Sequence, residues 1–339
     1  MPEINFPEKI IFGKDTVNDF HPEGCEHAII ICDSDIMVNR GFLDLIKNKS
    51  TKIISHVSTV VNNNVYGLYS QASEKFFEKE AELIISVGSA AAIDCGMLLS
   101  HEGKTKFTAI PCCGACAMTD FEHSGYYDYR HSPDTVVLDS SIIRCMPSGT
   151  VAFDGMACFA YAVDTLNNTD NIITKDLAVA GAVGILKNIV PAYRGNIDAL
   201  EKLLYAMYFA VVAHRNGADL ESSVLSRASK FFADFGYPRS SVCALIIPTI
   251  MENEELQIKN SLYEIAMKTG TAHVDDYPDF AVSKLIDEVR KIQAVLGIPR
   301  AVSGFGLNEN EYRNKKSSTN VPDDLLDLCY YGSFRFMKL

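Results

Sequence analysis

The sequence predicts an N-terminal α/β domain followed by an all-α C-terminal domain. In the first half, short apolar runs alternate with helical stretches, a pattern typical of a parallel sheet covered by helices. After about residue 147, long apolar segments with helical spacing dominate. The 339 residues exceed the size at which a single core usually stops growing, so two domains, 1–147 and 148–339, are expected.

Four apolar runs of the first half are predicted to form buried strands. They cover residues 28–32, 52–57, 82–87 and 107–111. A helix is predicted over residues 67–80, between the second strand and the third. Parallel sheets of this kind bind ligands at the carboxyl ends of their strands.

The second half is predicted to be helical throughout. One helix is indicated by apolar residues that recur with a period of 3.6 from Val282 to Val295, and Gly297 ends it. Further helical segments cover residues 150–166, 173–190, 197–215, 221–235 and 241–252.

Composition argues against several classes of partner. The net charge is -12 and Lys and Arg do not cluster, so nucleic acid is not an expected partner. No apolar run reaches the roughly 18 residues that cross a bilayer, so no membrane partner is expected. The N-terminus lacks the features of a signal peptide, which favours a cytoplasmic protein with reduced cysteines.

The third predicted strand runs into a turn of small residues, Gly88-Ser89-Ala90, which precedes a helix that contains Asp94. A strand, a small-residue turn and a helix N-terminus form an anion site, because free N–H groups and the helix dipole face the ligand. The same residues also suit an ordinary strand-to-helix connection. Phosphate binding is therefore one of two interpretations of this turn.

A second small-residue loop follows the fourth predicted strand and contains Cys112, Cys113 and Cys116. The spacing of Cys113 and Cys116 matches a zinc half-site or a redox pair, but no second half-site occurs in the sequence. Buried structural thiols are the favoured interpretation, because free cysteine commonly packs as a small apolar residue.

Taken together, these segments resemble the iron-containing (group III) alcohol dehydrogenases of the dehydroquinate synthase-like superfamily. The resemblance covers nearly the whole chain. It implies a Rossmann-like dinucleotide-binding domain and a helical metal and substrate domain, with the site in the cleft between them. The similar segments are the opening strand (4–14), the Gly88 turn, residues 109–111, Pro133, Asp134, Asp139, Pro147, Asp154, and residues 244–248 and 296–299.

The resemblance implies NAD(H) as cofactor, with its pyrophosphate on the glycine-rich turn. Gly88 and Asp94 match the family's motif, whereas Ser89 and Ala90 replace two of its glycines. Asp33 matches an acidic position that contacts the adenosine ribose, and an acid there disfavours a 2′-phosphate. The implied cofactor-binding residues are Asp33, Gly88, Ser89, Ala90, Asp94, Cys112, Cys113 and Cys116.

The metal site implied by the resemblance is substituted. The family uses one Asp and three His, and Asp154 matches the Asp. The three His positions hold Cys158, Leu225 and Arg239, and Ser229 stands where a further catalytic-site His is usual. Leucine cannot ligate a metal and arginine does not release its proton. The two remaining ligands are too few for Fe or Zn, so a divalent metal is expected to be absent.

Two functions remain open from the sequence. The first is a metal-independent, NAD(H)-linked alcohol or aldehyde oxidoreductase acting on a small-molecule substrate. In it Arg239, oriented by Asp154, replaces the charge of the metal, and Cys158 belongs to the same candidate catalytic set. The alternative for Asp154 and Arg239 is a structural ion pair.

The second function is a catalytically inactive relative that acts as a ligand-binding, regulatory or scaffolding module. A different reaction on the same scaffold ranks below both. A homodimer is the candidate assembly. The sequence assigns no role to His123, His214 or His273, and Cys158 lacks the neighbouring base that a nucleophile needs.

Overall fold

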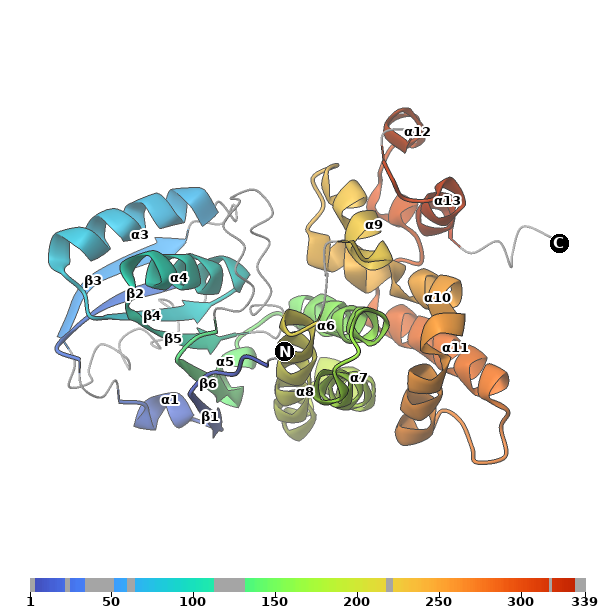
Figure 1. The fold of residues 1–339 in the computed structure, drawn as a ribbon, viewed down its shortest axis with the longest axis horizontal. Helices are drawn as coiled ribbons and strands as arrows, with labels where there is room; N and C mark the ends of the chain where they lie inside the picture. The colour runs from blue at the N-terminus through green and yellow to red at the C-terminus, as the bar shows by residue number, and fades with distance from the viewer. Residues whose placement is uncertain are drawn as a thin grey trace. The chain divides into compact units, whose positions relative to one another are not determined.

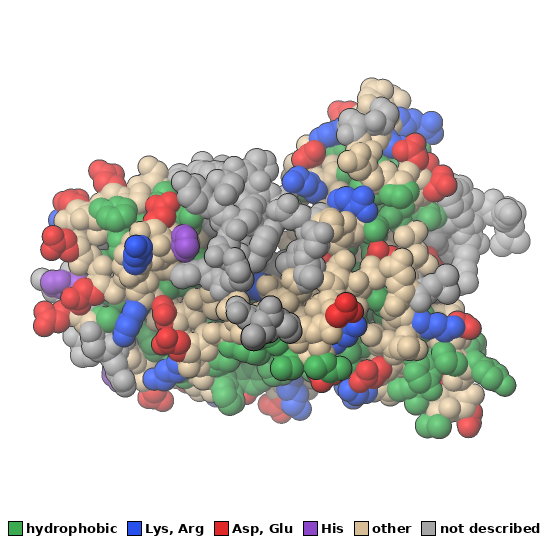
Figure 2. Space-filling model, in the orientation of Figure 1, with side chains coloured by type: hydrophobic (Ala, Val, Ile, Leu, Met, Phe, Trp, Pro, Cys, Tyr) green, Lys and Arg blue, Asp and Glu red, His purple; other side chains and the backbone are tan. Residues whose placement is uncertain are grey.

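The computed structural model describes residues 4–21, 25–33, 52–59, 65–112, 132–217, 222–316 and 319–332. The chain divides into two compact units, Met1–Pro147 and Ser148–Leu339 (Figure 1). Within the described ranges, no helix combines the length and the apolar character needed to cross a bilayer. On the face drawn in Figure 2, cationic and anionic side chains are interspersed.

The first unit is built on a parallel sheet with the strand order β1-β6-β5-β4-β2-β3 among the described residues. The central strands β2 and β4 are mostly apolar, as expected for strands covered on both faces. Ile30 and Ile85, which pair across these two strands, are fully buried. The strands are β1 (Lys9–Gly13), β2 (His27–Asp33), β3 (Lys52–Thr59), β4 (Leu83–Gly88), β5 (Lys106–Pro111) and β6 (Thr135–Asp139).

Helices α3 and α4 pack side by side against this sheet (Figure 1). The described helices of the unit are α1 (Thr16–Asp19), α3 (Val65–Lys79), α4 (Ala90–Gly103) and α5 (Ser140–Ile143). Gly96 lets α4 lie directly on the sheet, because a β-carbon there would come within 2.6 Å of the Phe107 ring and closer still to the Ser86 hydroxyl. This close approach packs the middle of α4 against β4 and β5.

The buried carboxylate of Asp139 ties the short helices to the sheet. It accepts hydrogen bonds from the backbone N–H groups of Ser141 (2.8 Å) and Val17 (2.9 Å), so it satisfies donors at the starts of α5 and α1. A third bond comes from the N–H of Asp15 (3.0 Å). Asp139 therefore has a structural role at the end of β6.

The second unit is helical in its described residues, as predicted. Asn171 and Asn196 cap two of its longest helices by accepting the N–H groups of Ile173 (3.0 Å) and Ala199 (2.9 Å). Its elements are α6 (Ser148–Asn168), α7 (Ile172–Tyr193), α8 (Ile197–Arg215), α9 (Val224–Ala233), α10 (Arg239–Thr269), α11 (Pro278–Leu296), the 3₁₀ helix η3 (Val302–Phe305), α12 (Glu309–Lys316) and α13 (Asp323–Tyr331).

Candidate functional site

The register of the sheet brings several residues of the predicted cofactor site to one edge. Cys32 pairs with Val87, so Asp33 and Gly88 end neighbouring strands. The Gly88 carbonyl accepts the N–H of Cys112 (3.0 Å), which follows β5. The chain leaves β2 toward one side of the sheet and β4 toward the other. A topological switch point of this kind, at the carboxyl ends of the strands, is where open parallel sheets bind ligands.

The turn between β4 and α4 suits an anion. Gly88 has a φ of 133°, a conformation that side chains disfavour. Ser89 is the N-cap residue of α4, its side chain does not cap the helix, and the first helical turn contains no acidic residue. No carboxylate of the first turn therefore offsets the helix dipole at this N-terminus, and Asp94 is buried a turn further on.

Other predicted cofactor residues lie wholly or partly outside the described part of the chain. These are Cys113 and Cys116, together with the side chains of Asp33 and Ala90. Cys112 is described and fully buried. The assignments of all these residues to cofactor binding remain predictions.

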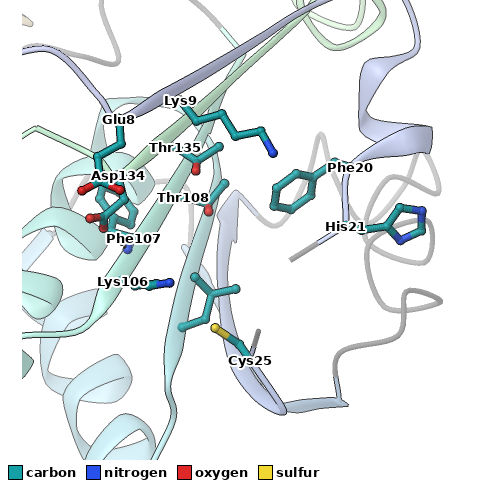
Figure 3. A pocket seen from close by; sticks show the side chains of 11 residues that line it. Glu8, Lys9, Phe20, His21, Cys25, Lys106, Phe107, Thr108, Asp134 and Thr135 are labelled. Atoms are coloured by element: carbon teal, nitrogen blue, oxygen red, sulfur yellow. Dashed lines mark hydrogen bonds between the residues drawn. The ribbon is translucent and has the colours of Figure 1, made fainter. Parts of the chain in front are cut away.

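A cavity of about 160 Å³ opens at the opposite edge of the same sheet (Figure 3). It lies at the amino ends of the strands, since Leu83 and Lys106, the first residues of β4 and β5, line it. Asp134, also in its wall, accepts the N–H of Phe107 (2.6 Å). Because Gly88 ends the strand that Leu83 begins, this cavity is separate from the turn between β4 and α4.

In the second unit, the positions matched to the family's metal ligands do not fit a divalent cation. Cys158 is fully buried, and burial together with the nearby Asp154 carboxylate raises the pKa of its thiol well above the usual value. The shift is opposite to the one that a nucleophilic thiolate requires. Leu225 is buried and apolar. Among the described residues, no three His, Cys, Asp or Glu side chains form a group that could hold a metal ion.

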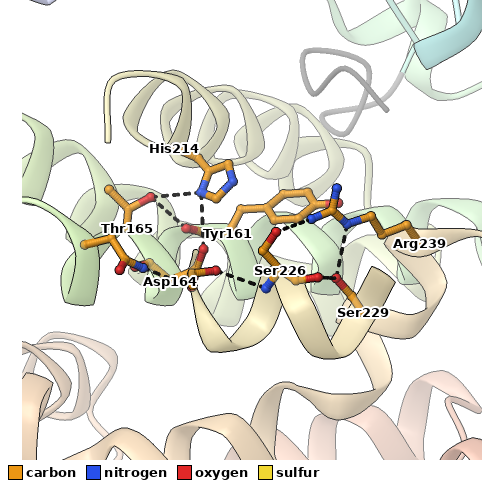
Figure 4. A network of polar contacts seen from close by, with 9 residues as sticks. Tyr161, Asp164, Thr165, His214, Ser226, Ser229 and Arg239 are labelled. Carbon is orange, nitrogen blue, oxygen red and sulfur yellow. Dashed lines mark hydrogen bonds and ion pairs between the residues drawn. The ribbon is translucent and has the colours of Figure 1, made fainter. Parts of the chain in front are cut away.

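Arg239, the first residue of α10, is held by two serines of α9 (Figure 4). Its Nε donates to the Ser229 hydroxyl (3.1 Å) and its Nη2 donates to the Ser226 hydroxyl (2.6 Å). Ser229 in turn donates to the Ser226 carbonyl (3.0 Å). The guanidinium is therefore oriented by a helix of its own unit. That Asp154 also orients it stays a prediction.

Asp164 of α6 and His214 of α8 form a buried polar pair next to this guanidinium, with 3.9 Å between Oδ2 and Nδ1. Burial raises the pKa of Asp164 to about 7. Burial and the charge of Arg239 lower the pKa of His214 to about 3, so the imidazole is neutral at neutral pH. Thr165 donates its hydroxyl proton to the Tyr161 carbonyl (2.8 Å), so His214 Nδ1 donates to the Thr165 oxygen (3.2 Å).

The two pKa shifts of this pair act oppositely on stability. The raised pKa of Asp164 costs stability as the pH rises from about 4 to about 7, because the unfolded chain loses that proton first. The lowered pKa of His214 adds stability as the pH rises from about 3 to about 6.5. Between about pH 4 and pH 6.5, the folded state and the unfolded state each hold one proton on Asp164 and His214 together. The two groups therefore cause little net change of stability with pH in this range. The folded protein carries that proton on the carboxyl.

Sequence reasoning missed most of this network. It noted His214 without assigning a role, and it overlooked Asp164 and Ser226. The available signal was the position of Asp164, the one charged residue in the mostly apolar segment 156–166. A buried acid on an apolar helix requires polar partners, and these come from α8, α9 and α10.

Comparisons with known proteins agree with the fold. No family model matches the sequence. The NADPH-dependent butanol dehydrogenase of Clostridium saccharobutylicum is 23% identical, with 93% of this chain and 89% of that protein covered.

Two solved structures have closely similar folds. The iron-containing alcohol dehydrogenase from Thermococcus thioreducens has a TM-score of 0.80 at 18% identity, covering 97% of this chain and 100% of that one. The sulfoacetaldehyde reductase from Bifidobacterium kashiwanohense, in complex with NAD+, also has a TM-score of 0.80, at 16% identity and 98% coverage of both chains. This chain is therefore similar in sequence to a butanol dehydrogenase and shares the fold of an iron-containing alcohol dehydrogenase.

Proposed function

We propose that this protein is a NAD(H)-linked alcohol or aldehyde oxidoreductase in which Arg239 replaces the charge of the family's metal. One observation carries the proposal: a position matched to a metal ligand holds a guanidinium fixed by Ser226 and Ser229. The dehydrogenase and reductase names of its relatives support the reaction class. The substrate is a small alcohol or carbonyl compound.

The residues at the carboxyl edge of the sheet fit a dinucleotide. Gly88 and Ser89, with the N–H groups at the start of α4, would hold the pyrophosphate. Asp33 at the end of β2 would contact the ribose, which favours NAD(H) over the phosphorylated cofactor. A bound nicotinamide supplies or accepts the hydride.

Arg239 would act on the substrate oxygen. Carbonyl reduction builds negative charge on that oxygen, and a fixed guanidinium stabilises the charge by hydrogen bonding. Arginine keeps its protons at physiological pH, so Arg239 stabilises charge and does not deliver the proton. Asp154 stays a candidate for orienting it. The Cys158 thiol is buried and neutral, so we assign it no covalent step.

Cofactor titration tests the first requirement of the proposal. Wild-type protein should bind NADH more tightly than NADPH. Gly88→Ala should weaken NADH binding roughly tenfold, because the free turn would relax away from the positive φ and binding would have to restore about 1–2 kcal/mol of strain. Isothermal titration calorimetry measures both affinities. Gly149→Ala is the matched control, since a β-carbon there meets no atom within 4 Å. Equal NADH affinity in Gly88→Ala and wild type would exclude this turn as the site.

Metal analysis tests the second requirement. We expect purified protein to hold less than one equivalent of iron or zinc and to keep its turnover after dialysis against EDTA, because the side chains at the ligand positions do not fit a cation. Elemental analysis and a turnover assay give the two readouts. A stoichiometric metal whose removal abolishes turnover would contradict the proposal.

A catalytically inactive ligand-binding protein is the second candidate. Full burial of Cys158 and near-complete burial of Leu225 favour it, because both fill metal-ligand positions with packed, uncharged groups. Turnover separates the candidates. An inactive protein shows no oxidation or reduction of NAD(H) with any alcohol or aldehyde.

A further inference from the structure

The start of α9 connects a buried carboxylate to Arg239 (Figure 4). Ser223 is the N-cap residue of α9, and its hydroxyl oxygen accepts the N–H of Ser226 (3.0 Å). The same hydroxyl donates its proton to the Asp164 carboxylate. The Ser226 side chain then accepts from Arg239 (2.6 Å). One continuous series of hydrogen bonds thus runs from α6 through α9 to the guanidinium on α10.

Asp164 is enclosed by groups from each helix packed around it. Asn168 of α6 donates to its Oδ1 (3.2 Å), and His214 of α8 lies 3.9 Å from its Oδ2. From α10, the positive charge of Arg239 favours the ionised carboxylate and the negative charge of Glu254 opposes it. Asp164 itself is 2% exposed, so these groups take the place of water.

We propose that Asp164 positions Arg239, by bonding to the serine that caps α9 and thereby fixing the two α9 hydroxyls that hold the guanidinium. The inference rests on the proposed function of Arg239 and adds a positioning residue to it. Asp164 does not touch the substrate in this arrangement. It acts through Ser223 and through its charge.

The ionisation of Asp164 changes the strength of this arrangement. An ionised carboxylate accepts a stronger hydrogen bond from Ser223 and attracts the guanidinium, whereas the protonated acid does neither to the same degree. Burial raises the pKa of Asp164 to about 7. The fraction of protein with an ionised Asp164, which holds Arg239 more strongly, therefore increases as the pH rises through neutrality. Arg239 should therefore be held more firmly on the alkaline side.

Hydrogen exchange at the Arg239 side chain tests the positioning directly. In isotope-labelled protein, the Nε–H signal that disappears in Arg239→Lys identifies the group that is bonded to Ser229. Asp164→Leu and Ser223→Ala should each speed its exchange at least tenfold. Asp164→Asn should keep most of the protection, because its amide oxygen still accepts from Ser223. Thr174→Val, which removes a buried hydroxyl of α7 that has no hydrogen-bond partner among the described residues, should leave the exchange unchanged.

Steady-state kinetics supply the second readout. Asp164→Asn should lower kcat with little change in the KM for NADH. The ratio of wild-type to variant kcat should rise with pH, with a midpoint near pH 7. Unchanged exchange in both Asp164→Leu and Ser223→Ala overturns the positioning role, as does a pH-independent ratio. If exchange responds but wild-type protein turns over no alcohol or aldehyde, the positioning role stands and the proposed oxidoreductase function fails.

Discussion

Arg239→Ala should lower kcat for carbonyl reduction by about 10²–10³-fold, the usual effect of removing one donor that stabilises a developing oxyanion. The expected loss of kcat is large because no metal is proposed to stabilise the negative charge on the substrate oxygen together with Arg239. NADH affinity should not change, since Arg239 is not among the residues proposed to hold the pyrophosphate and the ribose. Steady-state rates with saturating NADH, together with a cofactor titration, measure the two effects separately.

Two further arginine variants separate the effect of the guanidinium's shape from that of its charge and provide a control. Arg239→Lys keeps the charge but loses the planar fork that spans Ser226 and Ser229, so an intermediate loss of kcat is expected. Arg300→Ala removes an exposed arginine of the same unit and should leave kcat unaffected. Wild-type kcat in Arg239→Ala would remove this residue from the mechanism and leave the guanidinium as a structural group.

The strands of the first unit were the easiest elements to predict. Residues 28–32 are a continuous apolar run, and residues 83–87 are apolar apart from Ser86. Such short runs are typical of strands covered on both faces. β6 (Thr135–Asp139) was missed. Its apolar core is only three residues long, and its place depends on pairing with β1 and β5, which are distant in sequence.

The end of α10 shows why helix boundaries are harder to predict than helices. The prediction stopped at residue 252, where a polar run begins, but the helix continues to Thr269. Leu262 and Ile265 are fully buried, so packing sustains the helix beyond the polar run. Ile258 has a φ of -112°, which marks an interruption within the helix.

Some residues of the candidate site could be predicted from the sequence, and others could not. Gly88 and Arg239 were predicted from sequence as site residues, because local patterns and family resemblance pointed to them, and their roles stay predictions. Asp164, Ser223 and Ser226 were not, since their importance comes from contacts between α6 and α9, whose residues are about 60 apart in the chain. A sequence pattern marks a buried acid, but only the packing of the helices reveals its partners.

Gly181→Ala should produce the largest loss of stability among single-methyl additions to the helical unit. A β-carbon at Gly181 would lie 2.7 Å from the backbone nitrogen and 2.9 Å from the Cα of Ala210, so α7 and α8 must move apart. Overpacking of this kind costs about 1–3 kcal/mol, more than the roughly 1 kcal/mol that alanine gains over glycine in a helix. The midpoint of thermal unfolding should fall by roughly 2–4 °C for each net kcal/mol.

Compensating variants distinguish a backbone clash from a side-chain clash. At Gly184 the added β-carbon meets the Ala206 side chain at 2.6 Å, so Ala206→Gly should restore much of the stability lost in Gly184→Ala. Ala210→Gly should not rescue Gly181→Ala, because the nearest atom is backbone. Gly149→Ala, with open space around it, should be neutral or stabilising. If Ala210→Gly restored full stability to Gly181→Ala, as Ala206→Gly is expected to do for Gly184→Ala, the backbone clash would be contradicted. Side chains alone would then set the distance between α7 and α8.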